Sequence, residues 1–295
     1  LSVIKDLSIM PVLGTITDEA VVRRTIASYG VDVLFHAAAY KHVPLVEANA
    51  LEGIRNNVLG TKVIAEACLK LGVQNVVLIS SDKAVRPTNV MGATKRWAEL
   101  LFQEASTQVA KMGTGQRFSA VRFGNVLGSN GSVVPLFKEQ IAAGGPVTLT
   151  DQAMTRYFMS IREAAELIVQ AGALSDGGDV FLLDMGKPIL IKDLAENMIR
   201  LAGFTVRDEH NPDGDIAVVA VGKRPGEKMF EELFYDDNTA FPTRHQKIMR
   251  SPHNDHSPRN INADLAMLMD ALAAEDESRA RHILFEVIQE TKAHI

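Results

Sequence analysis

Short apolar runs alternate along the first half of this chain with longer stretches in which apolar residues recur every three or four positions. The runs predict buried strands, at residues 31–35, 76–79 and 117–123. The periodic stretches predict amphipathic helices, at residues 17–30, 47–71 and from Trp97 onward. Strands that alternate with helices in this order predict βαβ units and an α/β fold with a doubly wound parallel sheet.

Local signals set the boundaries of these elements. Thr17 or Asp18 is the expected cap of the first helix, because short polar side chains accept hydrogen bonds from free N–H groups there. Gly30 and Gly72 are expected to end two helices. Residues 11–14 resemble the end of a strand, so we expect the chain to start partway through the domain that contains the sheet.

The second half of the chain has a looser pattern. Beyond about residue 129 the segments are shorter, and glycine and proline separate them at 144–146 and 224–226. This punctuation is typical of a smaller domain that closes over a pocket. Residues 262–295 predict two helices with alternating charge, which we interpret as a solvated or assembly surface.

Composition narrows the class of protein. With 46% hydrophobic and 23% charged residues among 295, the chain can bury an ample core. A net charge of -5 without blocks of Lys or Arg argues against a nucleic-acid partner. Cys68 is the only cysteine, which excludes an internal disulfide and indicates a reducing, cytoplasmic compartment. The sequence contains no run of eighteen apolar residues and no signal-peptide pattern, so we expect this chain to be soluble.

The stretch from Ser80 to Lys95 is the main candidate for chemistry. It follows a predicted buried strand, and open α/β sheets bind ligands at the carboxyl ends of their strands. Pro87 and Gly92 indicate a loop, after which helical spacing resumes. We therefore expect Lys95 in a first helical turn, facing back toward the strand end.

A second candidate follows the strand at 31–35. The small residues Ala37, Ala38 and Ala39 would let a flat ligand lie against the backbone, although tight packing of a helix on a strand explains them equally well. No G-x-G-x-x-G follows a strand anywhere in the 295 residues. Either the first strand and its glycine-rich loop are missing from this chain, or the fold binds no dinucleotide. The abrupt start of the βαβ pattern favours the first explanation.

Several motifs together resemble the polysaccharide-biosynthesis nucleotide-sugar 4,6-dehydratases, which are extended short-chain dehydrogenase/reductases. The most specific is the run Asp82-Lys83-Ala84-Val85-Arg86-Pro87-Thr88-Asn89. The others are Phe35 to Pro44, Asn56 to Thr61, Arg122 to Gly128, Met154 to Phe158 and Arg224 to Lys228. The resemblance extends to about Arg250.

This resemblance implies a Rossmann-like fold. Residues 1–128 would form a partial NAD(P)-binding domain without its first strand and glycine-rich loop. Residues 129–295 would form mainly a nucleotide-sugar-binding cap, with returning core segments and C-terminal helices. The implied cofactor is NAD or NADP and the usual substrate is UDP-N-acetylglucosamine. Larger members carry amino-terminal membrane helices, so this chain would be cytoplasmic or the cytoplasmic domain of an inner-membrane protein, without membrane contact of its own, and a homo-oligomer.

The chemistry of the family assigns roles to the loop. Oxidation at sugar C4 acidifies the C5 proton, water is lost across C5 and C6, and the hydride returns to C6. Asp82 and Lys83 match the family's acid and base for the loss of water. As a base Lys83 needs a lowered pKa, which burial and cations such as Lys95 or Arg86 could supply. An ordinary loop ion pair is the alternative.

Met91 is where the chain departs from most of the superfamily, which has Tyr-x-x-x-Lys. A thioether cannot take a proton, but the Met-x-x-x-Lys form resembles one branch of the dehydratases. Lys95 is then assigned to the nicotinamide ribose, and Ser80 or Ser81 to hydrogen bonding near the 4-hydroxyl. Which group deprotonates that hydroxyl stays open.

The remaining implied roles are in binding. Asn125 and Lys41 are assigned to the sugar or its phosphate, Arg156 and Arg224 to the diphosphate, and Glu227 to the uridine ribose. A surface salt bridge is the alternative for each arginine. Asn57 resembles the helix asparagine that organises a water relay to the lysine.

Two other readings of the sequence remain. A nucleotide-sugar epimerase would share the fold but normally needs the tyrosine, and a non-catalytic nucleotide-sensing module would explain the loss of both the tyrosine and the glycine fingerprint. The joint presence of Asp82, Lys83 and Lys95 argues against the second. We expect no metal site, because His36 and His42 lack carboxylates at ligand spacing, and we expect a packed or capping role for both.

Overall fold

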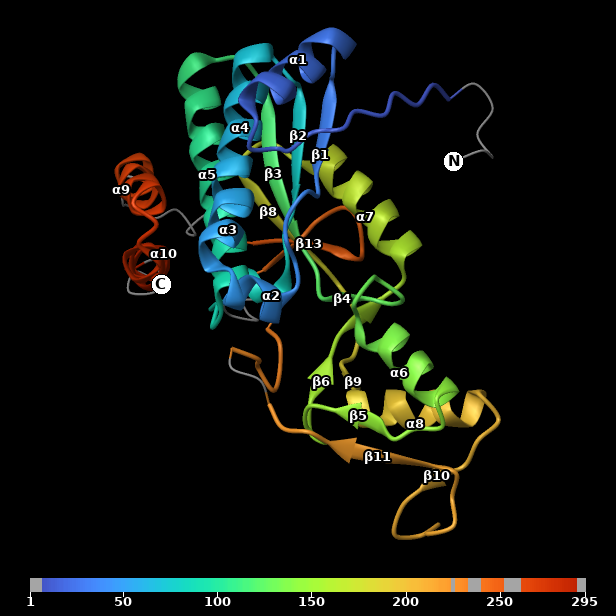
Figure 1. The fold of residues 1–295 in the computed structure, drawn as a ribbon. Coiled ribbons are helices and arrows are strands. Elements are labelled where there is room, and N and C mark those ends of the chain that lie inside the picture. Colours follow the sequence, from blue (N-terminus) through green and yellow to red (C-terminus); the bar gives the residue numbers. More distant parts are fainter. Residues whose placement is uncertain (1–6, 224–225, 233–239, 252–260, 291–295) are drawn as a thin grey trace.

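The computed structural model describes residues 7–223, 226–232, 240–251 and 261–290 (Figure 1). Its helices are α1 (Glu19–Tyr29), α2 (Val43–Ala48), α3 (Ala50–Ile54), the π-helix η1 (Arg55–Leu59), α4 (Gly60–Leu71), the 3₁₀ turn η2 (Asp82–Ala84), α5 (Val90–Met112), α6 (Val133–Ala142), α7 (Ile161–Leu174), α8 (Ile191–Leu201), α9 (Ile261–Ala273) and α10 (Glu277–Glu290). Its strands are β1 (Val33–His36), β2 (Asn75–Ile79), β3 (Arg117–Arg122), β4 (Asn125–Val126), β5 (Val147–Leu149), β6 (Thr155–Arg156), β7 (Phe158–Met159), β8 (Asp179–Leu183), β9 (Ile189–Leu190), β10 (Val206–Arg207), β11 (Ile216–Ala220), β12 (Phe241–Pro242) and β13 (Ile248–Arg250).

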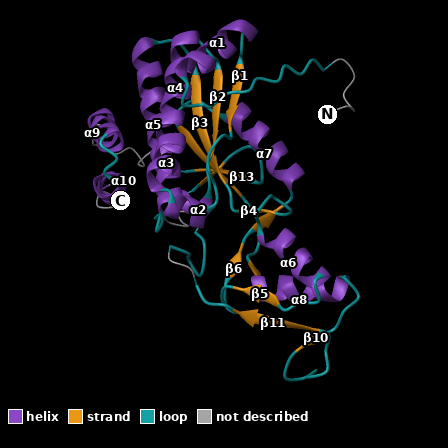
Figure 2. Cartoon of the chain, viewed as in Figure 1, coloured by secondary structure: helices purple, strands orange, loops and turns teal. Residues whose placement is uncertain are grey.

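A six-stranded sheet in the order β1-β2-β3-β8-β13-β12 organises the larger part of the molecule (Figure 2). The first four strands are parallel, and β13 pairs antiparallel with β8 and with β12. The predicted parallel α/β sheet is therefore confirmed. Because β8, β12 and β13 come from the second half of the sequence, the chain returns to this sheet after building its smaller lobe.

Helices cover both faces of the sheet, which explains the continuous apolar runs. On β2, Val76 and Leu78 pack in a cluster with side chains of α1, α4 and α5, whereas Val77 packs in the cluster that includes residues of α7. Alternate side chains of a strand point to opposite faces, so a strand covered on both sides must be apolar throughout. Figure 1 shows α7 across the sheet from α4 and α5.

The smaller lobe lies below the carboxyl ends of β2 and β3 in Figure 1. It consists of the parallel sheet β10-β11-β5 with α6 and α8, around a cluster that includes Phe137, Ile191 and Ile216. The short pairs β4 with β7 and β6 with β9 lie between the two parts. A ligand at the edge of the main sheet would therefore meet both parts of the molecule.

Several predicted boundaries are correct, and others are wrong for local reasons. Asp18 caps α1 with its carboxylate, and Gly30 and Gly72 end α1 and α4 with left-handed backbone. The predicted helix at 47–71 is instead broken at Asn49 and contains the π-turn η1. The spacing of apolar residues did not reveal the π-turn, because the turns on either side of it remain helical. Residues 11–14 form no strand.

The C-terminal helices do not form a purely solvated surface. α9 and α10 pack against α5 and share a core cluster with Trp97 and Leu100 (Figure 1). Arg281 on α10 pairs with Glu47 at 2.8 Å, and Glu47 in turn accepts a hydrogen bond from Val90 N at the start of α5. This hairpin therefore stabilises the helix that carries Lys95.

Within the described ranges, no helix combines the length and the apolar character needed to cross a membrane.

Candidate active site

The loop after β2 is held rigidly by short-range hydrogen bonds. Ser81 caps the turn η2 by accepting from Lys83 N, and Asn89 caps α5 by accepting from Gly92 N. A Cβ on Gly92 would lie 2.3 Å from Lys83 O, so only glycine lets α5 approach the loop so closely. The two caps and the close approach of α5 thus fix the backbone of Asp82 and Lys83 at the carboxyl edge of the sheet.

Asp82 and Lys83 form the centre of the site. Lys83 Nζ donates to Asp82 Oδ1 at 3.0 Å and to Asn125 Oδ1 at 3.4 Å, and Ser81 Oγ donates to the same carboxylate oxygen at 2.8 Å. The Asp82 N–H donates to Phe123 O, which continues the backbone pairing of β2 with β3 beyond the ends of both strands. The structure therefore brings four of the predicted residues together, with Ser81, Asp82 and Lys83 on one loop and Asn125 on β4.

A residue that sequence reasoning missed completes this cluster. Glu231 Oε1 lies 3.5 Å from Lys83 Nζ and 3.9 Å from Arg156 Nε. Its side chain is only 4% exposed, compared with 1% for that of Asp82. The one available signal was the acidic pair Glu231-Glu232 shortly after the Arg224 to Lys228 motif, and nothing in its spacing relates it to Lys83.

The expected lowering of the Lys83 pKa is wrong. Burial lowers this pKa, but the charges of Asp82 and Glu231 and the hydrogen bond to Asp82 outweigh burial and the opposing charge of Arg156, so the net shift is upward. Arg86 does not supply the expected effect, because its guanidinium pairs with Glu232. Lys83 is therefore an ammonium group in this arrangement.

Lys95 lies in the second turn of α5 rather than in the first, because the helix begins at Val90. As predicted, it faces the strand end, where its Nζ donates to Ile79 O at 2.9 Å. Burial, opposed by the charge of Glu99, lowers the pKa of Lys95 to about 8. Lys95 thus sits directly beside the carboxyl end of β2.

A network of buried charged side chains lies next to the carboxyl end of β2. Glu99 accepts two hydrogen bonds from Arg122, at 2.7 and 2.6 Å, and one from Arg96 at 3.1 Å. Ser80 Oγ donates to Glu99 at 2.6 Å. Since Ser80 serves this network, Ser81 is the better placed of the two serines to meet a ligand.

Met91 and His36 are packed side chains. Met91 is 3% exposed and belongs to the apolar cluster that includes Trp97. His36 shares a hydrogen bond with Thr61 Oγ1 at 2.9 Å and stacks on Phe102, as its predicted packed role requires. Burial and the charge of Lys95 lower the pKa of His36 to about 3, so its ring is neutral.

Asn57 holds the loop that follows β1. Its amide accepts from Tyr40 N at 2.8 Å and donates to Tyr40 O at 3.0 Å and to Thr94 Oγ1 at 2.9 Å. The π-turn η1 places this side chain between the loop and α5. Of the residues assigned there, Ala37, Ala38 and Lys41 are exposed and Ala39 is half-buried.

Arg156 is engaged with the chain itself. Its guanidinium donates to Thr155 O at 2.7 Å, Lys228 O at 2.8 Å and Met229 O at 3.1 Å. Of the other two predicted binding residues, Glu227 is half-buried, and Arg224 lies outside the described residues. In this structure Arg156 anchors residues 226–232 beside the loop 82–89.

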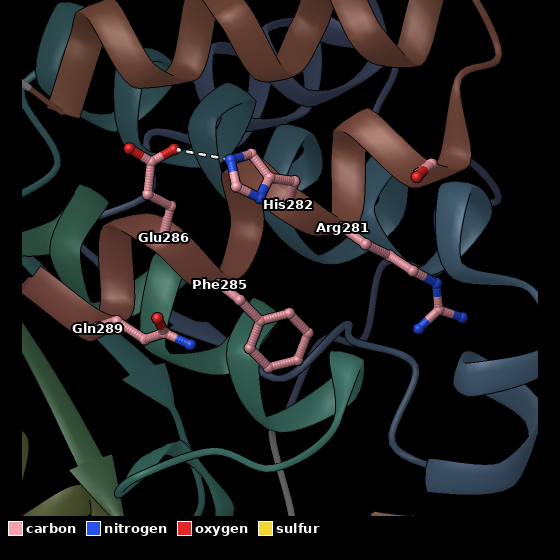
Figure 3. A pocket seen from close by; sticks show the side chains of 6 residues that line it. Arg281, His282, Phe285, Glu286 and Gln289 are labelled. Atoms are coloured by element: carbon pink, nitrogen blue, oxygen red, sulfur yellow. Dashed lines mark ion pairs between the residues drawn. The ribbon is translucent and has the colours of Figure 1, made fainter.

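A separate hollow of about 390 Å³ lies along α10 and is lined by Ser278, Arg281, His282, Phe285, Glu286 and Gln289 (Figure 3). His282 and Glu286 pair across one helical turn at 3.6 Å. All the lining residues belong to this one helix and none to the loop 80–95. Over the described part of the chain, no group of three or more His, Cys, Asp or Glu side chains could hold a metal ion.

A doubly wound sheet with acid–base groups at its carboxyl edge and a second lobe facing that edge defines a Rossmann-like enzyme fold. Residues 3–253 match the model of a family described as polysaccharide biosynthesis protein. The chain therefore belongs to this family, which confirms the resemblance of its motifs.

Two relatives show the range of the family. The capsular polysaccharide biosynthesis protein CapD of Staphylococcus aureus is 50% identical over 82% of this chain and 38% of its own length. A UDP-N-acetylglucosamine 4,6-dehydratase (inverting) of Campylobacter jejuni is 34% identical over 77% of this chain and 63% of its own. This chain thus spans less than two thirds of either relative.

Solved structures share the fold. Pen from Bacillus thuringiensis superposes with a TM-score of 0.71 at 35% identity, covering 82% of this chain and 72% of its own. A dTDP-glucose 4,6-dehydratase from Streptomyces venezuelae, a double mutant solved with NAD bound, gives a TM-score of 0.63 at 22% identity, covering 75% and 69%.

Proposed function

We propose that this chain carries the active site of an NAD- or NADP-dependent nucleotide-sugar 4,6-dehydratase that acts on UDP-N-acetylglucosamine. The observation that carries the proposal is the ion pair of buried Asp82 with half-buried Lys83, 3.0 Å apart, at the carboxyl edge of the sheet. Loss of water needs one group that donates a proton and one that accepts a proton, and this pair supplies both in one place. The likeness to the Campylobacter dehydratase supports the choice of substrate.

The residues present are suited to form part of a cofactor site. Ala37 and Ala38 leave exposed backbone at the carboxyl end of β1, and Lys95 lies at the end of β2, where it can donate to ribose hydroxyls. When bound, the nicotinamide would supply hydride transfer from sugar C4 and back to C6. The solved dehydratase with NAD supports this choice of cofactor.

The proton chemistry belongs to the chain itself. Removing the C5 proton and breaking the C6–O bond forms a C5=C6 double bond, and the leaving hydroxyl takes a proton to become water. Asp82 and Lys83 hold one mobile proton between them, and it resides on Lys83 in this structure. Its transfer along the 3.0 Å hydrogen bond gives a neutral amine that can accept the C5 proton and a carboxylic acid that can protonate the leaving hydroxyl. Neither the total charge nor the number of protons changes.

The binding roles extend this proposal. Asn125, which contacts Lys83, would orient the sugar, and Ser81 would hydrogen-bond near the 4-hydroxyl. Arg156, with Arg224, would face the diphosphate, and Glu227 and Lys41 would complete the nucleotide and sugar contacts. The whole enzyme would serve polysaccharide synthesis, as the family description suggests.

A mass measurement tests the proposal. We would incubate the full-length protein containing this chain with UDP-N-acetylglucosamine and NAD or NADP, and analyse the nucleotide sugar by mass spectrometry. A dehydratase gives a product lighter by one water. An epimerase gives an isomer of unchanged mass, and a non-catalytic module returns the substrate, so either result would reject the proposal.

A further inference from the structure

Glu231 approaches the loop 82–89 from a segment far away in the sequence. Its Oε1 lies 3.5 Å from Lys83 Nζ, and its side chain is 4% exposed. The charged groups that face Lys83 are Asp82 from its own loop, Arg156 from β6 and Glu231 from residues 226–232. Lys83 thus lies between two carboxylates.

The charges of this cluster balance only when Lys83 is protonated. Two carboxylates then face an ammonium and a guanidinium, and burial of charge is tolerated when charges are paired. A neutral Lys83 would leave one negative charge in excess. Among the described residues, Asp82 Oδ2 and Glu231 Oε2 have no hydrogen-bond partner, so each carboxylate relies on its other oxygen for pairing.

Independent contacts hold Glu231 in this position. Arg156 binds the carbonyls of Lys228 and Met229, and Lys228 Nζ donates to Val85 O at 2.9 Å. Thr88 Oγ1 and Asn89 Nδ2 both donate to Gly226 O. Residues 226–232 are therefore fastened to the loop 82–89 at several points, with Glu231 directed to Lys83.

We infer that Glu231 is a positioning residue that keeps the mobile proton on Lys83 while residues 226–232 lie against the loop 82–89. Its carboxylate favours the ammonium form and opposes proton transfer to Asp82. The role in catalysis rests on the proposed function, whereas the effect on the protonation of Lys83 does not.

The test measures the titration of Lys83 directly. In the full-length protein, acetic anhydride labels neutral amines, and peptide mass spectrometry reports the labelled fraction of Lys83 as a function of pH. We expect the midpoint for Glu231→Gln to lie at lower pH than in the parent. The matched control is Glu232→Gln, because Glu232 lies next in sequence but pairs with Arg86 and Lys228. An unchanged midpoint in Glu231→Gln, or an equal shift in both variants, would overturn the inference.

A conservative variant guards against a folding defect. Glu231→Asp keeps the charge, so its midpoint should lie closer to the parent's than that of Glu231→Gln, and equal shifts in the two would show that the charge is not responsible. Labelling needs no sugar substrate, so its result stands apart from the outcome of the dehydration assay. With a confirmed dehydratase, the pH profile of solvent exchange at C5 should shift downward in Glu231→Gln as well.

Discussion

The indole Nε1 of Trp97 donates a hydrogen bond of 2.9 Å to the carbonyl oxygen of Leu284. Trp97 is fully buried on α5, one turn or less from Lys95, whereas Leu284 belongs to the C-terminal helix α10. The last helix of the described chain is thereby fastened to the helix that forms one wall of the candidate active site.

This relationship predicts that Trp97→Phe destabilises the protein. The change removes the donor and leaves a buried carbonyl unsatisfied, which costs about 1–3 kcal/mol, and the smaller ring adds a packing loss. Urea denaturation would measure the free energy of unfolding. Arg279→Ala on the exposed side of α10 is the control and should change it by no more than about 0.5 kcal/mol. Equal effects of the two changes would contradict the proposed fastening.

Replacing Lys83 by Met should remove solvent deuterium exchange at C5 while UDP-sugar binding changes only a few-fold. The structure adds a second expectation, because Asp82 and Glu231 would remain buried without their shared ammonium. Loss of one partner from such a site costs about 3–5 kcal/mol. Urea denaturation of Lys83→Met and of the parent would measure this deficit in the free energy of unfolding. Persistent exchange at the parental rate would assign the base elsewhere.

Met91→Leu tests whether the thioether has a chemical role. Met91 is packed in an apolar cluster, so a change that conserves volume should cost less than about 1.5 kcal/mol of stability. Turnover should stay within about tenfold, equivalent to roughly 1.4 kcal/mol of barrier. Steady-state kinetics would measure turnover, with cofactor and UDP-sugar binding as controls. A thousand-fold loss with intact binding would give the sulfur a specific function.

Lys95 should make stability depend on pH in the alkaline range. Its pKa is lowered from 10.5 to about 8 in the folded protein, so the unfolded chain binds more protons between these two values. Stability then rises with pH across this window, and below it the cost of burying the ammonium is paid in full. Relative to Lys95→Met, the free energy of unfolding of the parent should increase by up to about 3 kcal/mol between pH 8 and pH 10.5. A difference that stays flat or falls would show that Lys95 is not desolvated as described.

The sequence by itself determined the repeating framework of this protein. Apolar runs located β1, β2 and β3, Asp18 and two glycines marked helix ends, and the family motif placed Asp82 and Lys83 at a strand end. These features depend on local backbone preferences and on the burial of both faces of a strand, which a linear pattern records. The π-turn around Asn57 escaped detection, because the turns that flank it keep the same helical spacing.

Only the tertiary structure decided the electrostatics of the site. The pKa of Lys83 depends on whether carboxylates or cations lie within a few ångströms, and Glu231 reaches it from a distant segment. The same holds for Ser80, whose hydroxyl is directed to Glu99, and for the C-terminal helices, whose apolar faces find α5. Charge interactions and packing depend on distance in space, and a one-dimensional sequence does not specify that distance.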